Sequence, residues 1–300
     1  MNNGSKIAQS AQDKRLMAVI YVILGIATIC CILPFLLLIS ASLTDEMTIV
    51  SSGYNIWPRK FSLDAYRYLF THARELGTAY GITILVTLIG TSVNLVITML
   101  LAYVLSRRDL PGHKFFNFMV VFCMLFNGGM VATYLVYVDT FHIRNTLFAL
   151  IVPYLLMNCW NVMLARSYFQ NSIPFSIIEA ARIDGAGEFR IFLKIVIPLS
   201  LPIIATIGLF VAVAYWNDWL NGMIYISDAD MYSYQNLLTQ MLTNIQLLKQ
   251  NTEMAAAGAA IPSASVRMAI ASVGVIPILV VYPFFQKYFV KGIALGAVKE

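Results

Sequence analysis

Long apolar stretches separated by short polar connections form the main pattern of this chain. A membrane-spanning helix needs about 20 consecutive, mostly apolar residues. Six stretches meet this requirement, at residues 16–42, 79–105, 115–138, 146–168, 199–226 and 265–290. The pattern predicts an all-α polytopic membrane protein, with a six-helix domain over residues 16–290 and short tails at 1–15 and 291–300.

Composition supports the same fold class. The chain is 59% hydrophobic and 12% charged, whereas soluble domains contain about 25% charged residues. A soluble fold would lack the charged side chains to cover its exterior, so membrane lipid is the expected surroundings.

The basic residues lie mainly in the gaps between apolar stretches. Of the 20 Lys and Arg, 13 fall on the side that holds both termini. The positive-inside rule then places both termini in the cytoplasm. The net charge of +5 does not form a basic stripe with interleaved aromatic residues, so no nucleic-acid partner is predicted. The four cysteines and three histidines lack metal-ligand spacing, so no metal site is expected.

Two longer connections carry apolar residues of their own. Residues 43–78 mix aromatic and polar side chains, which favours an amphipathic segment at the bilayer surface. Residues 227–264 contain leucines at helical spacing and predict an external helix. That helix could be a lid or docking surface, or could simply cover neighbouring spans.

The connection between the fourth and fifth spans, the 171–198 segment, contains its own helix signals. Ser176 and Glu179 have capping-box spacing, which predicts a short helix from about Ile177. Asp184 and Gly185 predict a break, and a second helix should then run through Phe192.

The 171–198 segment contains both small residues and bulky apolar residues, and we expect them to face outward. A small residue lets a partner backbone approach, while a bulky one can fill a partner's cleft. The small set is Ala180, Ala181, Gly185, Ala186 and Gly187, and the bulky set is Ile178, Phe189, Ile191 and Phe192. Pro198 and Pro202 mark the return toward the membrane. The segment therefore has the features of a docking site for a soluble protein.

The same residues resemble a family motif. Glu-Ala-Ala at 179–181, Gly185, Ile195 and Pro198 have the spacing of the EAA loop of bacterial binding-protein-dependent importers, with Ile197 in place of the usual Leu. The resemblance continues through NGGMVATYLVY at 127–137, AYWNDWLNG at 214–222 and the ending from Phe284 to Glu300. The chain is most similar to carbohydrate permeases of the maltose-transporter type, in the Gram-positive branch that handles complex oligosaccharides.

The resemblance implies a set of partners and a role for the segment. The partners would be a second, homologous permease subunit, a dimer of ATPase subunits and an extracellular substrate-binding lipoprotein that delivers a sugar or oligosaccharide. The residues that would couple to the ATPase are Glu179, Ala180, Ala181, Asp184, Gly185, Ala186, Phe189, Phe192 and Pro198. Glu179 taken alone could equally be only a helix cap. The tail from Lys287 could touch the ATPase or be disordered.

No GxxxxGK[ST] phosphate-binding loop occurs in the chain. We therefore expect a pore-forming subunit without an ATPase site and without a bound cofactor, with ATP and Mg held by the partner ATPase. Closure of that ATPase would move the 171–198 segment and tilt the spans, which gives alternating access.

Polar and aromatic residues inside spans are candidates for the substrate path, because they are costly to expose to lipid. Aromatic faces stack on sugar rings, while amides and carboxylates bind hydroxyls. An aromatic belt with hydrogen bonds between helices explains the pattern equally well. The candidates are Tyr215, Trp216, Asn217, Asp218, Trp219, Asn158 and Asn161, with Asn221, Trp160 and Asn94 as further ones.

Two other classes compete with this interpretation. An ion-coupled secondary transporter would need carboxylates within its spans, where only Asp218 and Asp139 occur. A membrane-embedded enzyme would need clustered catalytic His, Asp or Glu, which the spans lack.

Overall fold

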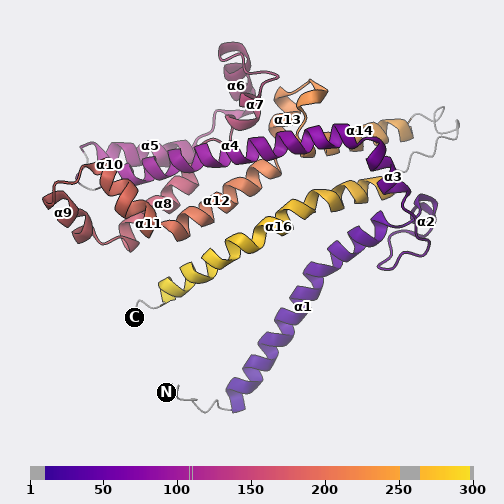
Figure 1. Cartoon of the computed structure of the whole chain (residues 1–300), viewed down its shortest axis with the longest axis horizontal. Helices are drawn as coiled ribbons and strands as arrows, with labels where there is room; N and C mark the ends of the chain where they lie inside the picture. The colour runs from indigo at the N-terminus through magenta and orange to yellow at the C-terminus, as the bar shows by residue number, and fades with distance from the viewer. Residues whose placement is uncertain (1–10, 108, 110, 251–263, 298–300) are drawn as a thin grey trace. The chain divides into compact units, whose positions relative to one another are not determined.

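The computed structural model describes residues 11–107, 109, 111–250 and 264–297 (Figure 1). Within these ranges the chain is helical and has no β-strand, although Thr44 and Phe61 form an isolated antiparallel bridge. Residues 1–10 and 298–300 of the two predicted tails, and residues 251–263 of the predicted 227–264 connection, lie outside the described residues.

The chain divides into two compact units, residues 1–71 with 248–273 and residues 72–247 with 274–300. The first unit contains α1 (Ala11–Ser42), α2 (Glu46–Ser52), α3 (Asp64–Thr71) and the start of α16 (Ala264–Ala297). Residues 15–36 of α1 are exposed although nearly all are apolar. The Glu46 carboxylate accepts hydrogen bonds from the backbone nitrogens of Ala264, at 2.9 Å, and Ser265, at 2.8 Å. An acidic side chain therefore compensates the unpaired N–H groups at the start of α16.

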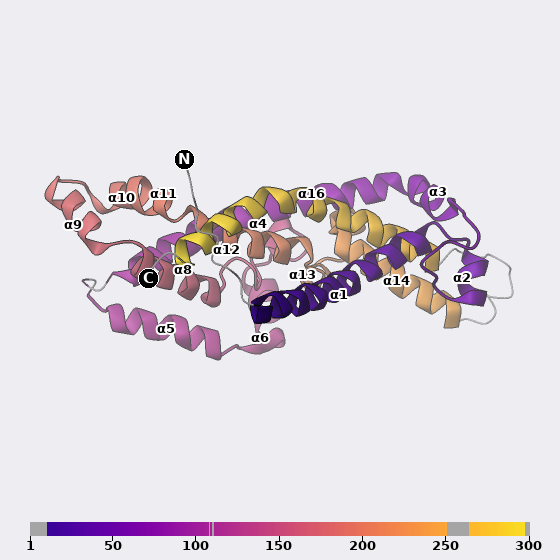
Figure 2. The same ribbon diagram turned by 90° about the horizontal axis from the view of Figure 1, so that it is seen from below.

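Three helices form the core of the second unit. The long helix α4 (Ala73–Ser106) packs along α8 (Cys159–Ser172) and α12 (Leu201–Trp216), as Figures 1 and 2 both show. Small residues allow α4 to approach its neighbours closely. At Gly90, a Cβ atom would overlap the ring of Tyr215 on α12.

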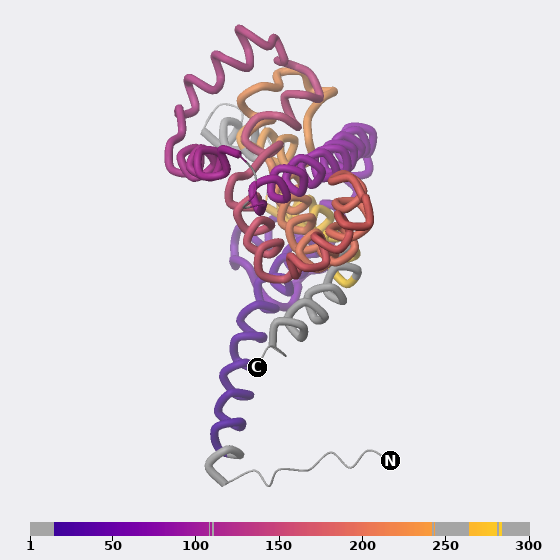
Figure 3. The backbone as a smooth tube through the Cα atoms, turned by 90° about the vertical axis from the view of Figure 1, so that its left-hand side faces the viewer, coloured from indigo at the N-terminus to yellow at the C-terminus, as the bar shows by residue number. Residues whose placement is uncertain are grey.

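The remaining helices of this unit lie toward the two ends of α4. At its N-terminal end, the hydroxyl of Thr83 accepts a hydrogen bond of 2.8 Å from the backbone of Tyr234. Tyr234 begins α14 (Tyr234–Gln250), the helix that the sequence predicts within 227–264, after α13 (Leu220–Tyr225) and η3 (Ala229–Met231). Beyond the C-terminal end of α4 lie α9 (Phe175–Ile183), α10 (Glu188–Ile191), η2 (Phe192–Val196) and α11 (Ile197–Leu199), at the near end of the bundle in Figure 3.

Several predicted spans are bent or broken. Among the described residues, α1 and α4 are long and apolar enough to cross a membrane, and two bent helix pairs bring the number to four if each pair is one span. The first pair is α5 (His113–Leu125) and the helix formed by α6 (Gly129–Leu135) and η1 (Val136–Thr140), and it is bent by 109°. The second pair is the helix over Glu188–Leu199 and α12, which meet at Ser200 with a bend of 81°. The predicted 146–168 helix is interrupted between α7 (Leu147–Ile151) and α8. Gly129 and Tyr154 have positive φ angles at two of these breaks, which no continuous helix permits.

Candidate functional site

The 171–198 segment forms a helix, a tight turn and a second helix. Helix α9 begins at Phe175, directly after Pro174, and no side chain caps it. The predicted start near Ile177 with a Ser176–Glu179 capping box is therefore wrong. Proline has no N–H to satisfy and its φ of −61° suits a residue that borders a helix, so the helix can begin immediately after it.

The predicted break at Asp184 and Gly185 is confirmed. Gly185 has a φ of +78°. Its backbone N–H donates to the Arg182 carbonyl at 2.9 Å, and that of Ala186 donates to the Ala181 carbonyl at 2.9 Å. This is the Schellman pattern, in which a left-handed glycine ends a helix and pairs its last carbonyls.

The second helix continues further than predicted. It runs from Glu188 through η2 and α11 to Leu199 rather than ending at Phe192, so Pro198 lies inside it. Pro198 stands just after the π-helical turn η2, where the helix changes from π to α geometry.

The segment has one exposed and one buried side. Ile183 is 86% exposed and Phe189 68% exposed. Ile178, Ile191 and Phe192 are buried, and the Phe192 ring packs on Tyr103 with 5.2 Å between ring centroids. The prediction that these three face outward is wrong, because each lies on the side of its helix that covers the core. Glu179, Ala180, Asp184, Gly185, Gly187 and Pro198 are exposed, whereas Ala181 and Ala186 are half-buried.

Ile183 was missed by sequence reasoning, although its position carried a signal. It is a bulky apolar residue directly before a predicted Asp-Gly turn, and such turns lie at the surface. Ile183 and Phe189 flank the Gly185 turn and give it a protruding apolar surface.

A four-charge ring of Arg107, Asp109, Arg182 and Glu188 supports this turn. Arg107 donates to both Asp109 carboxylate oxygens at 3.1 and 2.9 Å, and to Glu188 Oε2 at 3.1 Å. Arg182 donates to Glu188 Oε1 at 2.7 Å and to Asp109 Oδ2 at 3.0 Å. The sequence analysis used the basic residues of the connections only to orient the chain, and the pairing of Arg107 with Glu188 across 81 residues leaves no signal in one sequence.

Three of the predicted substrate-path residues, Asn94, Asn158 and Asn161, line a cavity of about 140 Å³ in the second unit. Asn158 and Asn161 border it together with Asn94 of α4 and Phe210 and Ala214 of α12. The cavity lies where the chain is broken between α7 and α8, so irregular backbone and three amide side chains meet at one place. Such a combination is typical of a solute path through a membrane protein.

The other predicted path residues are placed differently. Tyr215 is buried and donates to the Ile151 carbonyl at 2.8 Å. Trp216 is buried too, and among the described residues its indole nitrogen has no hydrogen-bond partner. The Asn217 side chain donates to the Val213 carbonyl at 2.9 Å, and Asp218 accepts from the backbone of Leu220 at 3.1 Å. Trp219 is exposed. These five side chains do not converge on one wall.

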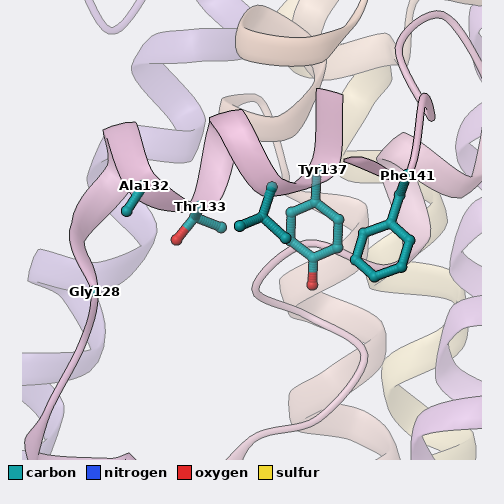
Figure 4. A pocket seen from close by; sticks show the side chains of 6 residues that line it. Gly128, Ala132, Thr133, Tyr137 and Phe141 are labelled. Atoms are coloured by element: carbon teal, nitrogen blue, oxygen red, sulfur yellow. The ribbon is translucent and has the colours of Figure 1, made fainter. Parts of the chain in front are cut away.

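A second hollow, of about 340 Å³, lies at the surface of α6 and η1. In Figure 4 the side chains of Thr133, Tyr137 and Phe141 project to the same side of this helix. The sequence analysis mentioned residues 127–137, which belong to this stretch, only as part of the resemblance to carbohydrate permeases.

Comparisons with known proteins agree over nearly the whole chain. Residues 9–295 match the family described as binding-protein-dependent transport system inner membrane component. Among relatives from Bacillus subtilis (strain 168), the polygalacturonan/rhamnogalacturonan transport system permease protein YtcP is 42% identical over 93% of this chain and 96% of its own length. Protein LplC is 38% identical over 89% of each chain.

A solved structure is also similar. A chain of the bacterial ABC transporter involved in the import of the acidic polysaccharide alginate is 30% identical and has a TM-score of 0.79, with 94% of this chain and 99% of that one covered. These findings confirm the predicted all-α polytopic fold and the predicted resemblance. The chain therefore belongs to the family of inner membrane components of binding-protein-dependent transport systems.

Proposed function

We propose that this chain is a permease subunit that carries a sugar or oligosaccharide across a bacterial plasma membrane by alternating access. An ABC importer permease is the function of its family and of its structural neighbour. The names of its relatives support a carbohydrate solute, because they include transporters of polygalacturonan, arabinooligosaccharides and melibiose. No relative supports the ion-coupled alternative.

The partners follow from this role. An importer permease of this family works with a second permease, an ATPase and a substrate-binding protein. Here the ATPase dimer binds ATP and Mg, while this chain binds neither and hydrolyses nothing. The binding protein is an extracellular lipoprotein. Both termini and the 171–198 segment lie on the cytoplasmic side, as the basic residues indicate.

The observation that carries the mechanism is the exposed turn at Gly185. Ile183 and Phe189 protrude beside it, and the helix after it is continuous to the bend before α12. A partner that binds the turn therefore contacts a helical element that leads directly into α12. The cavity beside Asn94, Asn158 and Asn161 is the proposed solute path, with amide groups to bind hydroxyls.

The experiment reconstitutes the permease pair, the ATPase and the binding protein in vesicles. The variant Gly185→Arg adds strain and bulk to the turn, because the glycine has a φ of +78°. We expect membrane insertion to persist while solute uptake per ATP hydrolysed falls at least about tenfold, the size of an interaction of about 1.4 kcal/mol.

Gly53→Arg is the matched control. Gly53 has a similar φ of +73° and open space around it, but it ends α2 in the other unit. Its variant should retain coupled uptake. If Gly185→Arg transports as well as the unaltered chain, or if no ATPase co-purifies with the chain, the proposed mechanism is wrong.

A further inference from the structure

The four-charge ring joins elements that are far apart in the chain. Arg107 follows the last residue of α4, Arg182 lies in the last turn of α9, and Glu188 is the first residue of α10. Each arginine contacts both carboxylates and each carboxylate contacts both arginines. The ring therefore holds the Gly185 turn from both of its sides and fastens it to the end of α4.

Arg107 is the buried member of the ring. Its side chain is 8% exposed, and its guanidinium also donates to the Tyr103 hydroxyl at 3.0 Å and lies 5.7 Å from the centre of the Phe175 ring. Burial alone would lower the pKa of Arg107, but hydrogen bonding to Asp109 and the nearby carboxylates raise it above its usual value. The guanidinium thus stays charged, and its planar fork serves several acceptors in a fixed geometry.

Helix α4 is held at the same end by α8. The side chains of Arg166 and Gln170 donate to the carbonyls of Leu105 and Ser106, each at 3.2 Å. These carbonyls belong to the last turn of α4 and have no partner within the helix. The end of α4 is therefore anchored both to a neighbouring span and, through the ring, to the 171–198 segment.

Helix α4 also reaches the cavity. Asn94 lies about 20 Å along the helix from Arg107, at 1.5 Å per residue, and borders the cavity with Asn158 and Asn161. The Asn94 amide donates to the Leu155 carbonyl at 2.7 Å, in the irregular stretch before α8. A displacement of the α4 end would therefore change the wall of the cavity.

We propose that the four-charge ring transmits movement of the 171–198 segment to α4, so that the second span moves together with the fifth when the ATPase acts. The chain itself joins the segment to α8 on one side and to α12 on the other. The ring adds a direct connection from the segment to the end of α4. Arg107, Asp109, Arg182 and Glu188 are positioning residues, since none of them needs to touch the solute. This inference rests on the proposed function.

The test uses the reconstituted complex with Arg182→Gln, Glu188→Gln and the double variant. Each single variant leaves an unbalanced charge in the ring. We therefore expect solute uptake per ATP hydrolysed to fall about tenfold. A change of this size is within the range by which mutations alter the coupling between two sites. The double variant should also fall about tenfold rather than a hundredfold, because both residues act in one unit. Lys114→Gln is the control, because Lys114 is exposed, is the second residue of α5 and lies outside the ring.

A second readout follows the movement itself. Spin labels at Val104 of α4 and Arg190 of α10, both exposed, report the distance between the two elements. This distance should stay constant through ATP binding in the unaltered ring and change in Glu188→Gln.

Arg107→Lys keeps the positive charge but not the planar guanidinium that serves several acceptors, so uptake per ATP should fall less than in Arg107→Gln.

The outcomes separate this inference from the function on which it rests. If the ring variants keep uptake per ATP and a constant label distance while Gly185→Arg loses coupling, the ring does not transmit movement and the function stands. Loss of ATPase binding in the ring variants would also overturn the inference, because it would mean that the ring only shapes the docking surface. If the unaltered complex shows no ATP-dependent uptake, the function itself fails.

Discussion

Asn158 and Asn161 lie three residues apart at the start of α8, yet they have different local roles. The side-chain oxygen Oδ1 of Asn158 caps the helix by accepting from the backbone nitrogens of Trp160 at 2.9 Å and Asn161 at 3.3 Å. Asn161 is placed one turn further on and borders the cavity without capping the helix. Both side chains border the cavity, but only that of Asn158 also caps the helix.

Substitution of the two asparagines tests this difference. Asn158→Ala should destabilise the chain by about 1 kcal/mol, the usual cost of a lost N-cap. Asn161→Ala should leave stability nearly unchanged and raise the solute concentration needed for half-maximal uptake. Thermal unfolding in detergent and uptake into vesicles measure the two effects. Equal uptake by Asn161→Ala and the unaltered chain would exclude this cavity from the path.

At residue scale, the sequence predicted the Gly185 turn but not which side chains near it are buried or form ion pairs. Asp184 and Gly185 have local backbone preferences, so their role could be predicted from two residues. The burial of Ile178, Ile191 and Phe192 depends on which side of each helix meets α4, and this is a tertiary property. The four-charge ring was missed for the same reason, since its members belong to separate elements.

Helix α4 shows how one small residue determines the packing of two elements. The ring of Tyr215 occupies the space beside Gly90, and its hydroxyl donates to Ile151 at 2.8 Å. The contact brings α12 close to α4 and places Tyr215 across from α7. A larger side chain at residue 90 must displace either the ring or the helix.

Gly90→Ala should therefore destabilise the chain by about 1–3 kcal/mol, the usual cost of overpacking a core. Gly81→Ala on the same helix is the control, because nothing lies within 4 Å of the added Cβ. It should be neutral or stabilise the helix by up to about 1 kcal/mol through helix propensity. Thermal unfolding of both variants measures the difference. Equal stability of the two would contradict the close contact between α4 and α12.

At element scale, the sequence predicts where apolar helices occur better than where they bend. The stretches 16–42 and 79–105 correspond to the continuous helices α1 and α4, although Pro34 lies inside the first. The stretch 146–168 contains Pro153 and Asn158 within an apolar run, and its break could not be distinguished from a kink. The bend at Ser200 lies between Pro198 and Pro202, the two prolines that the sequence placed at the return toward the membrane.

At the scale of the whole molecule, the chain leaves two kinds of surface uncovered. Residues 15–36 of α1 expose apolar side chains, which lipid or a second permease would cover. The turn with Ile183 and Phe189 is the other uncovered surface, beyond the end of α4 where the basic residues predict cytoplasm. The proposed function requires that the ATPase covers the turn with Ile183 and Phe189.

Cysteine cross-linking between this chain and the ATPase tests that requirement most directly. The four native cysteines are replaced by serine, and single cysteines are introduced as Ile183→Cys at the exposed turn and Ile178→Cys on the buried side of α9. A short bifunctional reagent should link Ile183→Cys to the ATPase, with a yield that changes when ATP binds, and should not link Ile178→Cys. If Ile183→Cys stays unlinked in every nucleotide state of a complex that transports solute, the turn does not couple ATP hydrolysis to transport.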